Sequence, residues 1–389
     1  MAKIRFVSPT DTYPKLAKEP NMRYCIRNYT KLKQVISTEF LSKITTKYMA
    51  DYYAKKFFFE NHLNFLLIFQ LTCKESLKEM SDLTKTNKKV KEYMPEISVS
   101  QVSRDNESQD YAMFAEIFYY LVDKALNNKR LNLSNEEKAY IKNIKILDST
   151  LIRLCLKYFN WAEYRKNVGA IKIHTLFDLK SLCPEKVFMT SGKPHDSLLI
   201  NVMGFEPGHT YLFDRGYVNY KVYDELCEKG IFFVTRLKKN AVMEVMEEYK
   251  LPEGDHNILS DCKVFLGQKN GNTTMKNALR LVIVYNDDED CVCILTNRFD
   301  LTALEIANLY RYRWQIEEFF KWIKQHLKVK KFFGDSENAV LIQILTALIV
   351  YVLLLLVQEE LGFQGTFLEL TRIFKNNTFE EFDEKVFRR

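Results

Sequence analysis

The feature that most constrains the fold of this chain is an uncharged run of 19 residues, AVLIQILTALIVYVLLLLV, at positions 339–357. A run of about 18 or more apolar residues can cross a membrane, but a helix that is apolar on all sides is also found in the core of a large domain. The run contains Gln343 and Thr346, no second such run accompanies it, and it follows a basic segment that needs water. We therefore interpret it as a buried core helix, with a membrane protein as the less favoured alternative.

Length, charge and metal-ligating residues limit the class of protein. With 389 residues, 47% of them hydrophobic, the chain is expected to form two or three domains. Its net charge of +7 equals the excess within residues 1–50, where ten Lys and Arg face three Asp and Glu, and this favours a polyanionic partner. Eight scattered cysteines without a CxxC pair are typical of reduced thiols in a cytosolic protein. Six widely spaced histidines leave carboxylates as the ligands of any metal.

Hydrophobic periodicity divides the chain into five stretches. Residues 1–138 have helical spacing, and residues 139–240 are predicted to form three strands, a helix, a strand, a helix and a strand. The second stretch therefore predicts an α/β layer with a mixed sheet. Residues 241–300 alternate with a period of two, which is typical of antiparallel strands. Helices are expected in 301–360, and 361–389 is expected to be a carboxyl-terminal tail.

The segment NLYRYRWQIEEFFKWIKQHLKVKK, residues 308–331, is crowded with basic and aromatic residues and is predicted to belong to one helix. A capping box formed by Thr302 and Glu305 places the start of this helix at about residue 303. The helix is expected to end near Gly334.

On a helical wheel of about 100° per residue, four side chains of this helix share one arc roughly 60° wide, at the margin of its apolar face: Tyr310, Arg313, Glu317 and Lys324. Glu318 falls among polar residues and is expected to face solvent. Glu317 could form only an intrahelical ion pair, worth a few tenths of a kcal/mol. Alternatively, it could hold a divalent cation while the other three bind phosphates, because phosphate chemistry uses both.

Two aspartates could share such a cation with Glu317. Asp148 ends the apolar stretch YIKNIKILD, and Asp214 ends HTYLFD. Either aspartate could instead be a cap or a turn residue. If both lie at the ends of adjacent strands and the helix packs on the same sheet, the three carboxylates form an all-oxygen site suited to Mg²⁺ or Mn²⁺. Such a site predicts two-metal phosphodiester chemistry.

Three blocks of the sequence, ILDST, YLFDRGY and YRYRWQIEEFFKWIKQHLK, resemble the catalytic blocks of bacterial DDE transposases of the insertion sequence 4 family. The third block contains the signature Y-(2)-R-(3)-E-(6)-K of that family, with every spacing kept at Tyr310, Arg313, Glu317 and Lys324. Other stretches, such as KPHDS, FFVTRLKKN and FFGDSENAV, also resemble the family. The resemblance therefore covers most of the chain.

The resemblance implies an α/β fold with an RNase H-like catalytic core that is interrupted by a β-strand insertion and preceded by an α-helical amino-terminal domain. Residues 1–138 would be the DNA-binding domain, and residues 139–240 and 301–360 would be the two parts of the core. Residues 241–300 would be the insertion, and 361–389 the tail.

The resemblance also implies a metal-dependent DNA transposase that moves an insertion sequence by cut-and-paste through a hairpin at the transposon end. Asp148, Asp214 and Glu317 would hold two Mg²⁺ or Mn²⁺ ions. The candidate DNA contacts are Tyr310, Arg313, Lys324, Arg215, Arg236 and Lys238. The expected partners are double-stranded DNA, as terminal inverted repeats and target, and a second copy of the chain. No membrane is expected, and the protein would act in the bacterial cytoplasm at the nucleoid.

One feature departs from the best-known members of that family, which flip a base onto a tryptophan of the insertion. Extruding a base costs a few kcal/mol, which stacking must offset. None of the three tryptophans of this chain lies in 241–300. Either another aromatic residue substitutes, or the hairpin step differs; the candidates are Tyr249, Phe265, Tyr285 and Phe299.

Two further classes of function stay open. The chain could be a structural or regulatory DNA-binding protein descended from a transposase, although three intact carboxylates argue against it. It could also be a metal-dependent nuclease of the same fold that never joins DNA ends.

Overall fold

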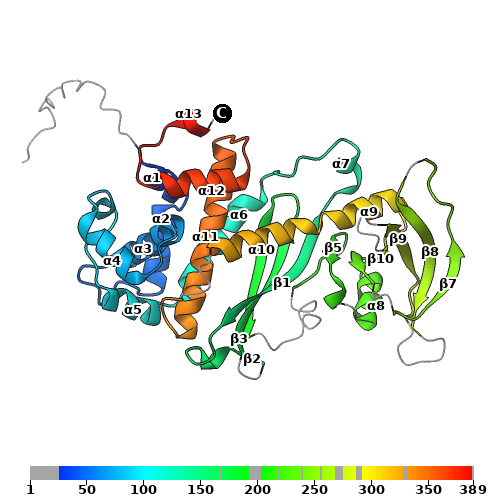
Figure 1. Ribbon diagram of the computed structural model, residues 1–389, viewed down its shortest axis with the longest axis horizontal. Helices are drawn as coiled ribbons and strands as arrows, with labels where there is room; N and C mark the ends of the chain where they lie inside the picture. The colour runs from blue at the N-terminus through cyan, green and yellow to red at the C-terminus, as the bar shows by residue number, and fades with distance from the viewer. Residues whose placement is uncertain are drawn as a thin grey trace, which may run out of the picture.

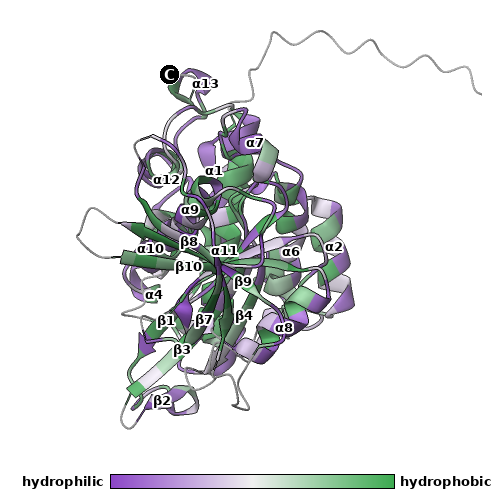
Figure 2. Ribbon diagram, turned by 90° about the vertical axis from the view of Figure 1, so that its right-hand side faces the viewer, coloured by the Kyte–Doolittle hydropathy of each residue, from purple (hydrophilic) through white to green (hydrophobic). Residues whose placement is uncertain are grey.

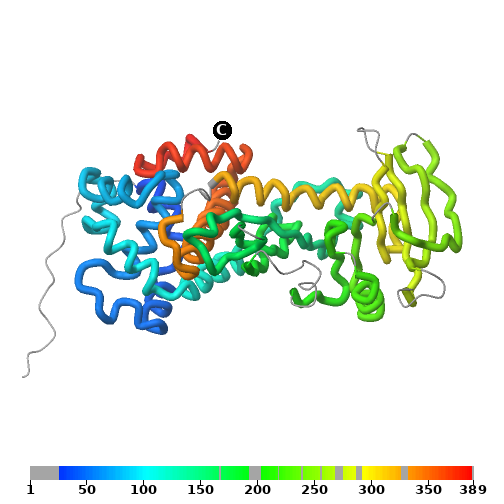
Figure 3. Tube along the Cα trace, turned by 60° about the horizontal axis from the view of Figure 1, so that its bottom comes forward, coloured from blue at the N-terminus to red at the C-terminus, as the bar shows by residue number. Residues whose placement is uncertain are grey.

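The computed structural model describes residues 26–387, apart from 166–167, 192–202, 218, 238–239, 255, 268–274, 286–290 and 327–331. The described part is elongated, with the amino-terminal helices at one end, a sheet in the middle and the strands β7 to β10 at the other end (Figures 1 and 3). Lys238, and nearly all of the short helix expected at 195–203, lie outside the described residues.

The helices that precede the sheet begin at polar caps. The side chains of Ser37, Ser76 and Asp110 accept hydrogen bonds from the first turns of their helices, which satisfies backbone N–H groups that have no partner within the helix. The helical spacing predicted up to residue 138 is observed. The elements are α1 (Asn28–Lys33), α2 (Thr38–Lys47), α3 (Phe59–Thr72), α4 (Leu77–Thr86), η1 (Val90–Glu92), α5 (Val99–Ser108), α6 (Tyr111–Leu126) and α7 (Glu137–Tyr140).

The sheet begins with a group of antiparallel strands followed by two parallel ones. Strand β1 pairs antiparallel with β3 and parallel with β5, and β5 pairs parallel with β6. This order agrees with the mixed α/β sheet predicted for 139–240. The elements are β1 (Ile144–Leu154), η2 (Asn160–Ala162), β2 (Glu163–Arg165), β3 (Val168–Asp178), β4 (Cys183–Ser191), β5 (Thr210–Phe213), η4 (Arg215–Tyr217), α8 (Tyr220–Glu228) and β6 (Phe232–Arg236).

The strands of the stretch 241–300 extend the same sheet. They are β7 (Met243–Glu248), β8 (Ile258–Leu266), β9 (Leu279–Tyr285) and β10 (Cys291–Thr296), and each pairs antiparallel with its neighbour. Strand β10 also pairs antiparallel with β6, so the described strands form one sheet of ten. The predicted antiparallel strands are present, and β7 lies at the edge of the sheet.

The single helix predicted from residue 303 to about 334 is wrong in one respect, because it is divided into α9 (Ala303–Arg311) and α10 (Trp314–His326). The capping box of Thr302 and Glu305 is present at the start of α9. Between the two helices the backbone tightens into i→i+3 hydrogen bonds, from Arg313 N–H to Tyr310 O and from Gln315 N–H to Tyr312 O. The axis nevertheless continues from α9 into α10 (Figure 1).

The uncharged run lies in α11 (Glu337–Glu360), which is long and apolar enough to cross a membrane but has 89% of its most apolar window buried inside the protein. It packs on α3, α6, α10 and α12. Figure 2 shows the strands as mostly hydrophobic, whereas outer helices such as α2 and α8 carry both hydrophilic and hydrophobic residues. The interpretation as a buried core helix therefore agrees with the structure.

The stretch 361–389, predicted to be a tail, is folded as far as residue 387. It contains α12 (Phe367–Asn376) and α13 (Glu384–Phe387). Leu370 and Phe374 of α12 are buried, and the Asn28 side chain of α1 donates a hydrogen bond to Asn377 O at 2.8 Å. Apolar residues at helical spacing therefore fix this end of the chain against the amino-terminal helices.

Candidate functional site

A row of three candidate site residues crosses the parallel strands of the sheet. Leu147 of β1 pairs with Phe213 of β5, and Phe213 pairs with Thr235 of β6. The next residues along these strands are Asp148, Asp214 and Arg236. Because parallel neighbours in register point to the same face, these three side chains lie side by side.

The row faces α9 and α10. Ile146 of β1 packs in the same apolar cluster as Ile316 of α10, whereas Leu147 packs with Tyr223 of α8 on the other face. Asp148 has the parity of Ile146 and so faces α10. The prediction that Asp148 ends its strand is wrong, because β1 continues to Leu154 through its pairing with β3. The shorter strand is β5, which ends immediately before Asp214.

Glu317 is brought to this row by the packing of α10. Phe319 of α10 is buried and its ring lies 5.5 Å from the ring of Phe177 on β3. On the adjacent face, Arg313 Nη2 donates to Glu317 Oε1 at 2.6 Å, and Arg313 Nη1 lies 3.7 Å from Asp148 Oδ2. The guanidinium of Arg313 therefore lies between the two carboxylates.

Burial dominates the electrostatics of Asp148, whose side chain is 20% exposed. Burial raises the pKa of Asp148 to about 6, and the nearby charges of Asp214 and Glu317 add to the rise. The Ser149 N–H, which donates to Asp148 Oδ1 at 2.7 Å, and the charge of Arg313 both oppose it. Three carboxylates thus interact at one point, and Arg313 is the cation that partly neutralises them.

The donor set fits a hard divalent cation, since it consists of carboxylate oxygens. Within the described ranges, however, no three Asp, Glu, His or Cys side chains lie close enough to enclose an ion as they stand. Arg313 accounts for this spacing, because its guanidinium fills the position between Asp148 and Glu317. The predicted ligands are therefore neighbours, and a cation would need Arg313 to move.

Tyr310 and Arg236 border the same site. The guanidinium carbon of Arg313 lies 5.7 Å from the centroid of the Tyr310 ring. Burial raises the pKa of Tyr310, with Asp214 adding to the rise and Arg313 and Arg236 opposing it. Three of the predicted residues, Asp214, Arg236 and Arg313, thus lie near one half-buried tyrosine.

Thr175 of β3 was not predicted from the sequence. It pairs directly with Asp148 and is fully buried, and its hydroxyl has no hydrogen-bond partner among the described residues. Its position depends on the register between β1 and β3. Thr175 could have been found from the sequence only if β1 had been predicted to continue beyond Asp148.

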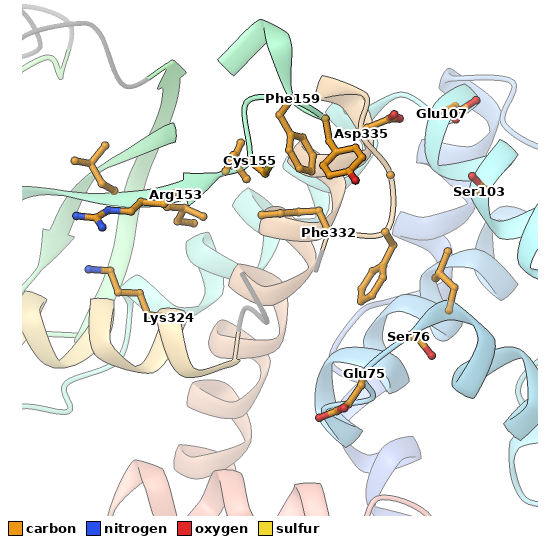
Figure 4. A pocket seen from close by; sticks show the side chains of 17 residues that line it. Glu75, Ser76, Ser103, Glu107, Arg153, Cys155, Phe159, Lys324, Phe332 and Asp335 are labelled. Atoms are coloured by element: carbon orange, nitrogen blue, oxygen red, sulfur yellow. The ribbon is translucent and has the colours of Figure 1, made fainter. Parts of the chain in front are cut away.

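Lys324 lies further along α10 and away from the row. It is exposed and lines a cavity between the carboxyl end of β1 and the amino-terminal helices, together with Arg153 (Figure 4). The cavity has aromatic walls, including Phe159 and Phe332, whose ring centroids are 6.0 Å apart. Arg153 is a second cation that sequence reasoning missed, because β1 was expected to end earlier.

The remaining predicted residues are less constrained. Arg215 follows Asp214 and is exposed. Of the four aromatic residues considered for base stacking, Tyr285 and Phe299 are 41% and 44% exposed, whereas Tyr249 lies under the guanidinium of Arg280. Glu318 is exposed, as predicted, with Lys321 Nζ at 3.7 Å from its carboxylate.

The part of the chain that contains this site is similar to known proteins. The family model of the transposase DDE domain matches residues 140–353. The chain belongs to the DDE transposase family. It is 36% identical over 252 residues to a protein named as transposase y4zB of Sinorhizobium fredii (strain NBRC 101917 / NGR234), covering 64% of this chain and 68% of that protein.

Two other proteins are similar to this chain. The chain is 28% identical over 262 residues to a protein named as a transposase for insertion sequence element IS5377 of Geobacillus stearothermophilus, covering 67% of each. The cryo-EM structure of a piggyBac transposase synaptic complex with hairpin DNA aligns with a TM-score of 0.47 and 11% identity, covering 94% of this chain and 85% of that one.

Family membership confirms the predicted class of protein. This DDE transposase is an enzyme that acts on DNA, in a family that generally uses divalent metal ions for DNA cleavage and strand transfer. The mixed sheet flanked by helices confirms the predicted α/β fold class. The family match begins at residue 140, so the helices α1 to α6 lie outside it.

Proposed function

We propose that Asp148, Asp214 and Glu317 hold two divalent cations, Mg²⁺ or Mn²⁺, with Asp148 shared between them. The observation that carries this proposal is the register that sets Asp148 beside Asp214, under the face of α10 that presents Glu317. Divalent ions at these carboxylates would supply Lewis-acid polarisation of the scissile phosphate and activation of water.

The chain's own cations then have a defined task. Arg313 neutralises Asp148 and Glu317 when no metal is bound, and it lies beside Tyr310. When divalent cations neutralise the carboxylates instead, Arg313 and Tyr310 are free to bind phosphate oxygens of the cleaved strand. A planar guanidinium suits this task because it can donate two parallel hydrogen bonds to a phosphate.

Other cations extend the DNA contact on both sides of the site. Arg236 lies at the end of the row, next to Asp214, and Arg215 follows Asp214 directly. Lys324 lies further along α10 and binds the DNA backbone at a point distant from the cut. Lys238 is a further proposed DNA contact, from its sequence alone.

The whole reaction is cut-and-paste transposition of an insertion sequence of the insertion sequence 4 type. Water attack frees a 3′-OH at the transposon end, and that hydroxyl attacks the opposite strand to form a hairpin, or attacks target DNA. The partners are the terminal inverted repeats, target DNA and a second copy of the chain in the synaptic complex. The protein acts in the bacterial cytoplasm at the nucleoid, without a membrane.

The domain assignment follows from this role. The helical stretch 1–138 binds DNA, 139–240 and 301–360 form the catalytic core, 241–300 is the insertion, and 361–389 is a carboxyl-terminal extension. Exposed Tyr285 or Phe299 in the insertion stacks the flipped base in place of a tryptophan.

Incubation of the purified protein with DNA carrying the ends of its element and Mg²⁺ tests the proposal. Nicks, hairpins and joined products are expected, and all three disappear in Asp148→Ala. Hydrolysis without joined products would identify a nuclease instead. Binding to the ends without cleavage in any divalent cation would identify a regulatory DNA-binding protein.

A further inference from the structure

The connection between α2 and α3 exposes an unusual set of apolar side chains. In this segment, residues 49–56, which we name the tyrosine loop, Met49 is 70% exposed, Tyr52 is 73% exposed and Tyr53 is 89% exposed. The rings of Tyr52 and Tyr53 meet edge to face, with centroids 4.8 Å apart. Neighbouring aromatic residues at full exposure are a feature of binding surfaces, since apolar side chains gain stability from burial.

The tyrosine loop is held in place by its polar residues. Asp51 Oδ1 accepts a hydrogen bond from Phe59 N–H, at the start of α3, at 2.6 Å. Gln109 Nε2 donates to Ala50 O at 3.3 Å, and the Ala54 N–H donates to Asp51 O at 3.0 Å. The tyrosines are therefore displayed on a fixed backbone, which lowers the entropy lost when a partner binds.

The lysines of the tyrosine loop differ from their neighbours in charge compensation. In residues 26–108, nine lysines form ion pairs with carboxylates, for example Lys43 with Glu39 and Lys47 with Glu116. Within the described part of the chain, the three other lysines of this range, Lys55, Lys56 and Lys88, have no ion pair of this kind. Two uncompensated positive charges thus follow directly on the two exposed tyrosines.

Two hollows lie between the tyrosine loop and α10, and one residue lines both of them. Tyr53, Lys55 and Lys56 line a cavity of about 1310 Å³ that extends to Arg104 and Glu107 of α5. Glu107 also lines the cavity that contains Lys324 of α10 (Figure 4). Both hollows therefore border α5.

We propose that the tyrosine loop contacts duplex DNA on the side of the helical region, away from the cut. Lys55 and Lys56 bind backbone phosphates, and the tyrosines contact sugars, phosphates and bases, because an aromatic ring with a hydroxyl fits both the apolar and the polar parts of a nucleotide. This inference rests on the proposed DNA-binding role of residues 1–138 and names the residues that carry it.

The charges favour DNA over a second copy of this chain. In a two-fold symmetric dimer the same patch would be used by both copies, which brings Lys55 and Lys56 close to their own counterparts. Like charges brought together in an interface are unfavourable. A polyanion instead compensates both lysines.

The test measures the affinity of the full chain for a fluorescently labelled duplex of mixed sequence over a series of salt concentrations. In the double variant K55Q/K56Q, the slope of log K against log salt is expected to fall by about 1.8, since each lost phosphate contact removes about 0.9. The matched control is K43Q/K47Q, which removes the same charge from exposed but paired lysines of α2. Equal effects of the two double variants would overturn the proposal, because net charge would then explain both.

The tyrosines are tested separately. Y52S/Y53S is expected to weaken binding roughly tenfold with an unchanged salt slope, because stacking and sugar contacts release few counterions. Circular dichroism checks that the variants keep their fold. Unchanged DNA binding, or a change in oligomeric state alone, overturns the proposal for the tyrosine loop. Failure of the unsubstituted chain to bind the duplex contradicts the proposed function itself.

Discussion

The two sides of α10 carry the same residue types but differ in what they can do. On the side that faces β1, Glu317 shares the guanidinium of Arg313 with half-buried Asp148. On the opposite side, Glu318 pairs with Lys321 at 3.7 Å, and both side chains are more than half exposed. An exposed pair of this kind contributes little free energy. Carboxylates held together at a half-buried point repel one another, and a bound cation relieves that repulsion. Adjacent glutamates thus differ through what each face of the helix packs on.

The largest expected effect is on catalysis at the side that faces β1. Glu317→Gln keeps the size of the side chain but removes its charge, so DNA cleavage should fall below detection, a loss of at least about a thousandfold. Binding of transposon ends should stay within a few fold. Cleavage and gel-shift assays on the same preparation measure both. A variant that cleaves at a rate close to that of the unsubstituted chain would remove Glu317 from the site.

The next effect concerns stability without metal. The pKa of Asp148 is raised to about 6 from 3.8. The folded state therefore binds this proton more tightly than the unfolded state does. The resulting contribution to the free energy of unfolding is fully present below about pH 4 and is lost as the pH rises through 6. Asp148→Asn has no ionisable group at this position, so its stability does not decrease in this way. At pH 8 it should be more stable than the unsubstituted chain by up to about 3 kcal/mol, because one pKa unit corresponds to about 1.4 kcal/mol.

Urea unfolding in the presence of a chelator measures the difference in the free energy of unfolding between Asp148→Asn and the unsubstituted chain. The difference should shrink between pH 8 and pH 5. A difference of equal size at both pH values would show that the charge of Asp148 is not the cause.

A smaller effect is expected at Arg313, which competes with a cation for the carboxylates. Arg313→Gln should bind Mn²⁺ without DNA about tenfold more tightly, because a favourable ion-pair competitor worth roughly 1–2 kcal/mol is removed. The same variant should bind DNA more weakly. Titration calorimetry with Mn²⁺ measures the affinity. Weaker Mn²⁺ binding would mean that Arg313 supports the metal site instead of occupying its place.

The smallest effect is expected on the solvent side of α10. Glu318→Gln removes an exposed charge whose ion pair is worth at most about 1 kcal/mol, so cleavage should change by less than about twofold. The cleavage assay used for Glu317→Gln measures this directly. Equal loss of cleavage in both variants would show that the two sides of the helix are not distinct.

Much of this comparison could be predicted from the sequence. The wheel separated Glu317 from Glu318, because amphipathic spacing on a packed helix fixes which side chains meet the sheet. The uncharged run was correctly interpreted as a buried helix, since its polar residues and basic neighbour disfavoured a membrane. The pairing of Asp148 with Asp214 followed from two apolar runs that each reach an aspartate.

The rest depends on contacts between distant segments. The continuation of β1 past Asp148 is stabilised by β3, which no local pattern reveals, and Thr175 and Arg153 were missed for that reason. The break between α9 and α10 involves Tyr312, whose hydroxyl donates to Glu137 at 2.5 Å from another part of the chain. The position of Arg313 between two carboxylates also needed the sheet and the helix together.

The central claim is that Asp148, Asp214 and Glu317 hold the metal ions of this transposase. The most direct measurement is the number of Mn²⁺ ions bound per chain in the DNA complex, from the electron paramagnetic resonance signal of free Mn²⁺ after subtraction of DNA alone. We predict two ions for the unsubstituted chain and for Glu318→Gln, and one or none for Asp148→Asn. Two ions retained in Asp148→Asn would contradict the claim.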